Sequence, residues 1–260
     1  MAGITFSVFT KPWKDLGMSE LGAFVERLGF EGIEFPLRPG YQVAPENAEK
    51  GLPELARVLG DHGVKITSVA GPTDERTFAA CAKAGVPVIR IMLRLEKENY
   101  LEAEARFHRE LQAMVPLCKR YGVTVGVQNH CGEFVNGGTG LRRMLEPYDP
   151  KQIAAVWDAA HIGLGGEEVE LSLDLVWSHL CMVNLKNAFW RRVNGPEATV
   201  AQWEWFWTSG RQGLASWPRI ARYLKEKSYR GVICLTAEYT AEDQVNRLIA
   251  EDIAFARSLL

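Results

Sequence analysis

The sequence lacks several features that would assign it at once to a class of proteins. It contains no uninterrupted apolar run of about 18 residues, the length that a membrane-spanning helix needs. Acidic and basic side chains nearly balance, and the formal net charge of −2 predicts no basic surface for nucleic acid or an anionic membrane. No apolar run is followed by a glycine-rich dinucleotide fingerprint or by a P-loop. We therefore expect no nucleic-acid and no membrane partner.

Cysteine is scarce and scattered along the chain. The five cysteines are Cys81, Cys118, Cys131, Cys181 and Cys234, and no two of them form a C-x-x-C pair. An odd number without paired spacing argues against a disulfide framework and against a thiolate zinc site. The amino-terminal segment has no basic region before its apolar run, so we predict a first strand there instead of a signal peptide. Reduced thiols and the lack of a signal peptide favour a cytoplasmic protein.

Short apolar runs alternate with amphipathic helical patterns along the whole chain. We predict strands at residues 4–9, 33–35, 64–70, 88–93, 123–127, 153–157, 181–185 and 232–236. A helical pattern follows each strand, the longest from about residue 99 to Gly122, which is its stop signal. Eight units of about 32 residues favour a (β/α)8 TIM barrel, with a doubly wound open sheet as the alternative. With no linker apparent, residues 1–260 are predicted to form a single domain.

Polar residues lie in or directly after several of the predicted strands. They are Glu34, Arg90, Arg94, Gln128, Asn129, His130, Asp158, His161, Asn184, Lys186 and Glu238. In a barrel the carboxyl ends of all strands meet on one face, so this pattern predicts a single polar site there. Structural roles are the alternative for each residue: Asp158 could cap the next helix, and Lys186 could pair with a neighbouring carboxylate. Likewise, Glu34 could tie down a loop, and His130 could be a loop histidine.

Four motifs occur in register: GFEGIE at 29–34, WDAAH at 157–161, VNLKN at 183–187 and GVICLTAE at 231–238. Together they resemble the xylose-isomerase-like TIM barrels, the sugar-phosphate isomerase/epimerase relatives that also include endonuclease IV. The resemblance implies a divalent metal, Mn, Mg or Zn, held by residues of strands five to eight. Carried over to this sequence, the metal positions are Gln128, Asp158, Asn184 and Glu238.

The chain departs from this family pattern at two metal positions. Gln128 stands where the family usually has Glu, and Asn184 stands where it usually has His. An amide oxygen can bind a hard cation, but it carries no charge and accepts no proton at neutral pH. We therefore predict that the metal is weakly bound or absent, unless His130, Glu133 or His161 has been recruited as a replacement ligand.

Aromatic residues crowd the segment 188–209, which is predicted to be a long loop after the seventh strand. They are Trp190, Trp203, Trp205, Phe206 and Trp207, with Trp217 further on. These side chains could pack on the barrel rim, form an apolar platform over a sugar, or make the interface of a homo-oligomer. Trp13 could contribute from the other side of the site. The predicted substrate contacts are accordingly Glu34, His130, Trp13 and Trp190.

The favoured function is that of a sugar isomerase or epimerase acting on a keto-sugar, a polyol or a sugar phosphate. It would abstract a proton next to a carbonyl, with Glu238 as base and Lys186 or a cation stabilising the enediolate. His161 and His130 would carry protons or contact the substrate. Two alternatives stay open, a one-base lyase or dehydratase and a sugar-binding barrel without catalysis. A nuclease with several zinc ions is disfavoured, because the chain has only five histidines and no basic surface.

Overall fold

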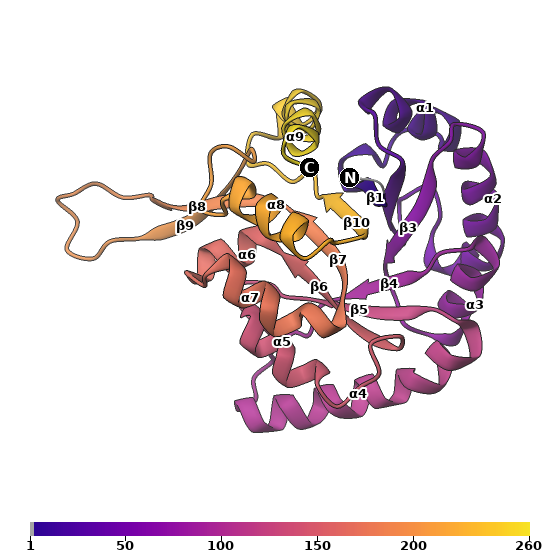
Figure 1. Ribbon diagram of the computed structural model, residues 1–260, viewed down its shortest axis with the longest axis horizontal. Coiled ribbons are helices and arrows are strands. Elements are labelled where there is room, and N and C mark those ends of the chain that lie inside the picture. Colours follow the sequence, from indigo (N-terminus) through magenta and orange to yellow (C-terminus); the bar gives the residue numbers. More distant parts are fainter. Residues whose placement is uncertain (1–2) are drawn as a thin grey trace.

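The computed structural model describes residues 3–260 and contains a closed barrel of eight parallel strands (Figure 1). The strands are β1 (Ile4–Phe9), β2 (Gly32–Pro36), β3 (Lys65–Ala70), β4 (Val88–Ile91), β5 (Thr124–Gln128), β6 (Ile153–Asp158), β7 (Leu180–Leu185) and β10 (Gly231–Leu235). They follow the order β1-β10-β7-β6-β5-β4-β3-β2, and the barrel closes because β1 pairs with both β2 and β10. The predicted (β/α)8 barrel is confirmed, and the open sheet is excluded.

Helices form the outer layer around the barrel (Figure 1). They are α1 (Met18–Leu28), α2 (Ala48–Gly60), α3 (Glu75–Ala84), α4 (Tyr100–Tyr121), α5 (Gly137–Leu145), α6 (Ala159–Gly165), α7 (Val169–Val176), α8 (Trp217–Glu226) and α9 (Val245–Leu259). Local chemistry sets their ends: Asn99 caps α4 through its side chain, and Gly122 ends α4 in the left-handed conformation at φ 66°. Within residues 3–260, no helix is long and apolar enough to cross a membrane.

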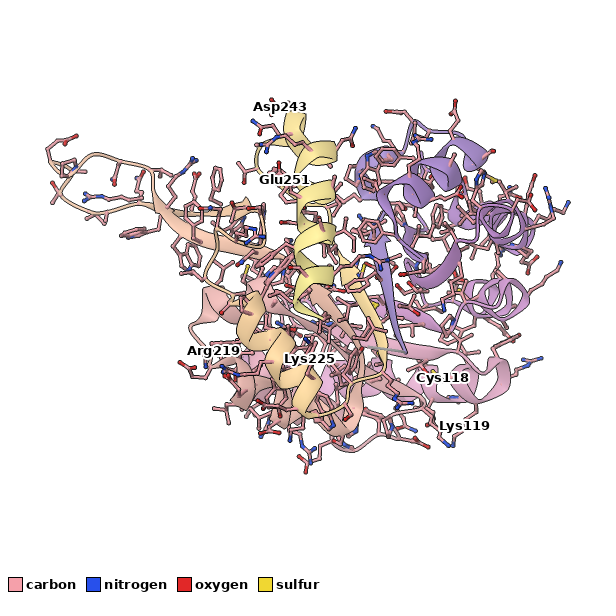
Figure 2. All side chains as sticks on the ribbon, turned by 45° about the horizontal axis from the view of Figure 1, so that its top comes forward. Cys118, Lys119, Arg219, Lys225, Asp243 and Glu251 are labelled. Atoms are coloured by element: carbon pink, nitrogen blue, oxygen red, sulfur yellow. The ribbon has the colours of Figure 1, made fainter. Side chains whose placement is uncertain are left out.

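The outer surfaces of these helices are charged, while their inner faces and the strands form the core. Figure 2 shows Arg219 and Lys225 on α8 and Glu251 on α9, at the outside of the molecule. The core includes Trp157 of β6, which is fully buried and donates its indole N–H to Ser172 Oγ at 2.8 Å. All five cysteines are free, as predicted. The expectation about a signal peptide also concerns Met1 and Ala2, which lie outside the described residues.

The segment after β7 forms a hairpin instead of the predicted loop. Strands β8 (Asn187–Arg192) and β9 (Trp203–Thr208) pair antiparallel as a separate two-stranded sheet, with Trp190 opposite Trp205. We call residues 187–208 the arm, because they project away from the barrel (Figure 1). Aromatic residues favour strands, and cross-strand aromatic pairs stabilise a hairpin. The loop prediction was wrong because it left out the strand propensity of these aromatic residues.

Candidate functional site

A central cavity of about 160 Å³ lies among the carboxyl ends of the strands. Its lining residues are Phe9, Lys11, Arg38, Arg90, Met92, Gln128, His130, His161, Asn184, Lys186, Thr236 and Glu238. A recess of about 660 Å³ shares Lys11 and Glu238 with it, and we call this the lysine-side recess. A second recess of about 540 Å³ shares Arg38, Arg90 and Met92 with the cavity, and we call this the arginine-side recess.

Most of the residues singled out in the sequence meet in this cavity. Those that line it are Arg90, Gln128, His130, His161, Asn184, Lys186 and Glu238. Glu34 and Asp158 do not reach it, because both are fully buried and hydrogen-bonded to residues that do. Their expected place as cavity-lining carboxylates is therefore not what the structure shows. Instead, these two carboxylates lie directly behind the side chains that line the cavity.

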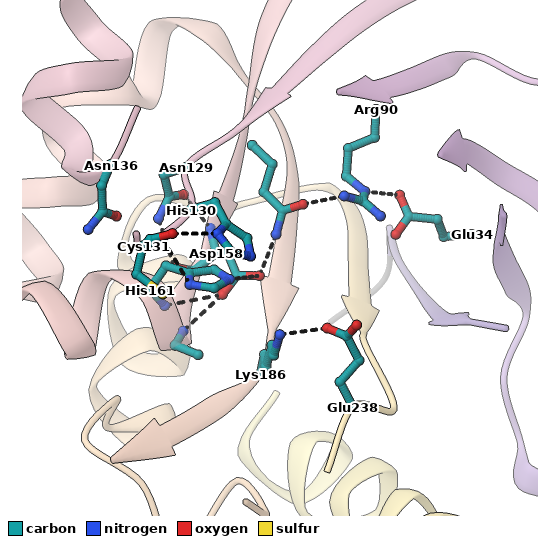
Figure 3. A network of polar contacts seen from close by, with 12 residues as sticks. Glu34, Arg90, Asn129, His130, Cys131, Asn136, Asp158, His161, Lys186 and Glu238 are labelled. Atoms are coloured by element: carbon teal, nitrogen blue, oxygen red, sulfur yellow. Dashed lines mark hydrogen bonds and ion pairs between the residues drawn. The ribbon is translucent and has the colours of Figure 1, made fainter. Parts of the chain in front are cut away.

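A chain of hydrogen bonds joins these two buried carboxylates (Figure 3). Arg90 Nε donates to Glu34 Oε1 at 2.6 Å, and Arg90 Nη1 donates to Gln128 Oε1. Gln128 Nε2 in turn donates to Asp158 Oδ2 at 2.8 Å. An amide both accepts and donates, whereas an ionised carboxylate only accepts. Glutamine at 128 therefore connects a cation to a carboxylate, which an ionised glutamate could not do.

Asp158 has the structural role that the sequence left as an alternative. Its Oδ1 accepts from the backbone N–H groups of Ala160 at 3.0 Å and His161 at 3.4 Å, and so caps α6. Asn129 holds its backbone from both sides, accepting from Asp158 N at 2.7 Å and donating to Asp158 O at 3.1 Å. Burial raises the pKa of Asp158 to about 6, although Lys186 opposes this shift.

Glu238 is held between two ammonium groups. Lys186 Nζ lies 2.5 Å from Glu238 Oε2, and Lys11 Nζ lies 2.7 Å from Oε1. Burial acts to raise the pKa of Glu238, but Lys186 and Lys11 outweigh it and hold this pKa well below its usual range. Lys186 also lies 3.6 Å from the ring centroid of Trp207, a cation–π contact. Glu238 is therefore an ionised carboxylate at neutral pH.

The rings of His130 and His161 contact each other, with centroids 3.9 Å apart and an interplanar angle of 37°. His161 Nδ1 accepts the N–H of Cys131 at 3.2 Å, so the proton of His161 is on Nε2, which has no hydrogen-bond partner among the described residues. His130 Nδ1 donates to Cys131 O at 2.6 Å, which leaves the lone pair of its Nε2 free. Burial lowers the pKa of both histidines, that of His161 strongly. At neutral pH this uncharged pair offers one N–H donor and one basic nitrogen.

The tryptophans proposed as substrate contacts lie at different places. Trp13 is buried, donates its indole N–H to Asn246 Oδ1 at 2.8 Å, and lines the lysine-side recess. Trp190 lies on the arm and does not line the central cavity, and its indole N–H donates to Leu164 O at 3.0 Å. Trp207 is the arm residue that lines the lysine-side recess. Its place could not be predicted from the sequence, because it depends on the register of the hairpin.

Two further lining residues, Lys11 and Arg38, were missed in the sequence. Each lies two residues beyond the end of its strand, Lys11 after β1 and Arg38 after β2. A search for cations shortly after every predicted strand would have found both. Exposed Glu133, considered above as a replacement ligand, pairs instead with Arg94 at 3.1 Å and does not line the cavity.

The four positions assigned to a metal by resemblance do not fit a divalent cation. Both carboxylate oxygens of Glu238 accept hydrogen bonds from ammonium groups, and Gln128 presents its N–H to Asp158. The charge of Lys186, which lies beside Glu238, would repel a second cation placed there. The fourth position, Asn184, supplies no imidazole, the ligand that suits Zn²⁺ and similar ions.

A different group of ligand-type atoms lies beside this site. In the described part of the chain, His130, Cys131 and His161 bring one ligand atom each to within 4.8 Å of one another. Burial raises the pKa of the Cys131 thiol, which disfavours the thiolate that a metal needs. The Nδ1 atoms of His130 and His161 are both hydrogen-bonded to the backbone of Cys131. The two histidines would therefore have to bind a metal through their Nε2 atoms.

We expect protein purified without added metal to carry well under one equivalent of Zn²⁺ or Mn²⁺ by elemental analysis. The double variant Gln128→Glu with Asn184→His should bind these ions more tightly, because it restores a carboxylate and an imidazole. A full equivalent of metal that survives dialysis against a chelator would contradict this expectation. If the Cys131→Ser variant then lost this metal, the ion would be located at the His130–Cys131–His161 group.

Comparisons with known proteins agree with this fold. A family model described as a xylose isomerase-like TIM barrel matches residues 23–259. The structure resembles D-psicose 3-epimerase from Clostridium cellulolyticum H10, with 12% identity, a TM-score of 0.74, and coverage of 98% of this chain and 99% of the other. It also resembles 3-keto-D-glucoside 4-epimerase from E. coli, with 14% identity, a TM-score of 0.75 and the same coverage.

A third similar structure has a different kind of name. It is a "probable 3-DHS dehydratase" from Bacillus anthracis, with 14% identity, a TM-score of 0.72, and coverage of 94% of this chain and 97% of the other. No curated protein sequence matches this chain significantly. At such identities the structural likeness establishes the fold, and the chemistry has to be argued from the cavity itself.

Proposed function

Because the chain belongs to the xylose isomerase-like TIM barrel family, as its motifs predicted, we propose that it is a sugar isomerase/epimerase-like enzyme. Its substrate would be a keto-sugar, a polyol or a sugar phosphate. The observation that carries the proposal is the Lys186–Glu238 pair, which shares one cavity with the free Nε2 of His130. A carboxylate, an ammonium group and a neutral imidazole are suited to moving a proton next to a carbonyl. The sugar epimerases among the similar structures support this choice.

In the proposed reaction Glu238 removes a proton from the carbon next to the carbonyl. Lys186 donates a hydrogen bond to the carbonyl oxygen, which becomes negatively charged as the enediolate forms. An ammonium group has three N–H donors, so Lys186 can donate to the substrate oxygen while it still contacts Glu238. Sharing Lys186 with the substrate weakens the interaction that keeps the pKa of Glu238 low, so the carboxylate becomes more basic when the substrate is in place.

The two histidines would have different roles. His161 is fully buried and neutral, so we propose that its Nε2–H donates to a substrate hydroxyl instead of carrying a proton. His130 has a free basic nitrogen and is half-buried, so it could exchange a proton with the substrate. Because Gln128 is not a base, His130 is the one lining residue that could act as a second base beside Glu238.

We expect a one-base reaction, because Glu238 alone remains of the two carboxylates that the family resemblance implies. The test is to incubate keto-sugars with the enzyme in D₂O and to follow them by NMR. We expect isomerisation without inversion at the carbon whose proton exchanges with solvent deuterium. Elimination β to the carbonyl, with a histidine as the acid that protonates the leaving hydroxyl, is the runner-up because it too needs a single base, and it would appear in the same experiment as loss of water.

Formation of an inverted epimer carrying solvent deuterium would contradict the one-base reaction. If His130→Ala abolished inversion but kept isotope exchange, the second base would be His130. If no keto-sugar were turned over and yet sugars bound, the barrel would be a binding protein. The amides at Gln128 and Asn184 favour this alternative, because they are the two ligand positions that carry no charge.

A further inference from the structure

The walls of the central cavity carry more positive than negative charge. Four basic side chains line it, namely Lys11, Arg38, Arg90 and Lys186, against one carboxylate, Glu238. The other two carboxylates of the site, Glu34 and Asp158, lie behind the wall and are fully buried. A ligand in the cavity therefore meets mainly cations.

Arg38 is the cation without a carboxylate partner. Lys11 and Lys186 share Glu238, and Arg90 is paired with Glu34, whereas Arg38 forms no ion pair within residues 3–260. Arg38 is half-buried, with its guanidinium carbon 6.0 Å from the centroid of the Phe9 ring. A partly desolvated charge without a counter-ion is unfavourable, so this position is suited to a ligand that supplies the anion.

Arg38 and Arg90 both lie at the boundary between the central cavity and the arginine-side recess. The guanidinium carbon of Arg90 lies 5.0 Å from the centroid of the same Phe9 ring, and both arginines line the central cavity and the arginine-side recess. This recess of about 540 Å³ gives room for a group larger than water. Guanidinium groups bind carboxylate and phosphate through paired N–H donors.

Unpartnered polar atoms in the same cavity are an independent sign of a ligand. Asn184 is 1% exposed, and in the part of the chain that the structure describes neither its Oδ1 nor its Nδ2 has a hydrogen-bond partner. The Nε2–H of His161, fully buried, also has none. Buried polar groups are normally hydrogen-bonded. Hydroxyl groups of a bound sugar would supply an acceptor for each N–H and a donor for the amide oxygen.

We propose that the substrate is an anionic sugar derivative, either a sugar phosphate or a sugar acid, an inference that rests on the proposed function. Its phosphate or carboxylate binds Arg38, with support from Arg90, at the boundary with the arginine-side recess. Its hydroxyl groups bind Asn184 and His161, and its reacting carbon lies beside Glu238 on the opposite side of the cavity. Arg38 is thus the residue that selects anionic over neutral sugars.

Three unreactive probes with the same six-carbon chain test this inference by isothermal titration calorimetry. Sorbitol 6-phosphate carries a phosphate, gluconate carries a carboxylate, and sorbitol is neutral. None has an aldehyde or ketone group, so binding is measured without turnover. At least one anion should bind more than about tenfold tighter than sorbitol, since a hydrogen bond to a charged group is worth a factor of roughly 10–100. The anion that binds distinguishes phosphate from carboxylate recognition.

Variants of single arginines complete the test. Arg38→Gln should weaken binding of the preferred anion by about 10–100-fold and leave sorbitol unchanged, while Arg38→Lys should retain part of the preference. Arg27→Gln is the matched control, because Arg27 lies 5.8 Å over the ring of Phe24, outside the cavity, and forms no ion pair. It should bind all probes as the parent protein does.

Equal binding of sorbitol and both anions, no binding of either anion, or an unchanged affinity in Arg38→Gln would overturn the inference. These outcomes are distinct from failure of the proposed function. Turnover of a neutral keto-sugar without anion preference would refute only the anion site. Anion binding through Arg38 without turnover of any sugar would refute only the enzyme.

Discussion

The Glu238→Gln variant is expected to turn over its sugar substrate about 10²–10⁴-fold more slowly than the parent protein, the usual contribution of a general base. Glutamine keeps the size of the side chain and an oxygen that can accept from Lys186 or Lys11, so the cavity should keep its shape. It cannot take up a proton at neutral pH. The loss should therefore appear in kcat, with KM and the calorimetric affinity for the substrate little changed.

Glu133→Gln is the matched control for this experiment. Glu133 is an exposed carboxylate that pairs with Arg94 and lies outside the cavity lining, so kcat should not change. Unchanged kcat in Glu238→Gln would exclude Glu238 as the base and make His130 the strongest remaining candidate. A loss of affinity with little loss of kcat would assign Glu238 to substrate binding alone.

The Arg90→Met variant is expected to lose about 3–5 kcal/mol of unfolding free energy, the cost of leaving a buried charge without its partner. Arg90 and Glu34 are 6% and 0% exposed in their side chains, with Arg90 Nε and Glu34 Oε1 2.6 Å apart. Methionine fills much of the space but supplies no charge, so Glu34 must remain unpaired or take up a proton. Urea unfolding followed by circular dichroism measures the difference.

Two comparisons test whether the lost charge is the cause. Arg94→Met removes the neighbouring arginine, whose pair with Glu133 is exposed on both sides, and should cost at most about 1 kcal/mol. The double variant Glu34→Met with Arg90→Met should recover much of the stability, because no buried charge is left unpaired. Equal losses in Arg90→Met and Arg94→Met would show that burial of the Arg90 pair does not matter to stability.

The barrel could be predicted because its signal is local and repeated. Eight apolar runs, each followed by an amphipathic helical pattern, leave few topologies that avoid crossed or left-handed connections. The arm could not be predicted in the same way. Its two strands are joined by the long connection 193–202, without the two-residue turn that marks a short hairpin in a sequence. Strand propensity alone would have had to reveal it.

The sequence by itself determined the fold and the face on which Gln128, His130, Lys186 and Glu238 gather. Both follow from the order of segments, since the carboxyl ends of parallel strands meet at one end of a barrel. Contacts across that face were not determined in this way. Glu34 is 56 residues from Arg90, and Lys11 is 227 residues from Glu238.

Only the tertiary structure decided which of these residues are accessible and how they are charged. It buried Glu34 and Asp158 behind the cavity wall, placed two lysines beside Glu238, and left Arg38 without a counter-ion among residues 3–260. Desolvation and Coulomb interactions depend on distances through space, at scales of a few ångströms. A sequence specifies those distances only through the packing of the whole barrel. The acid strength of the site residues and the charge of the ligand that they suit can therefore be inferred only from the folded chain.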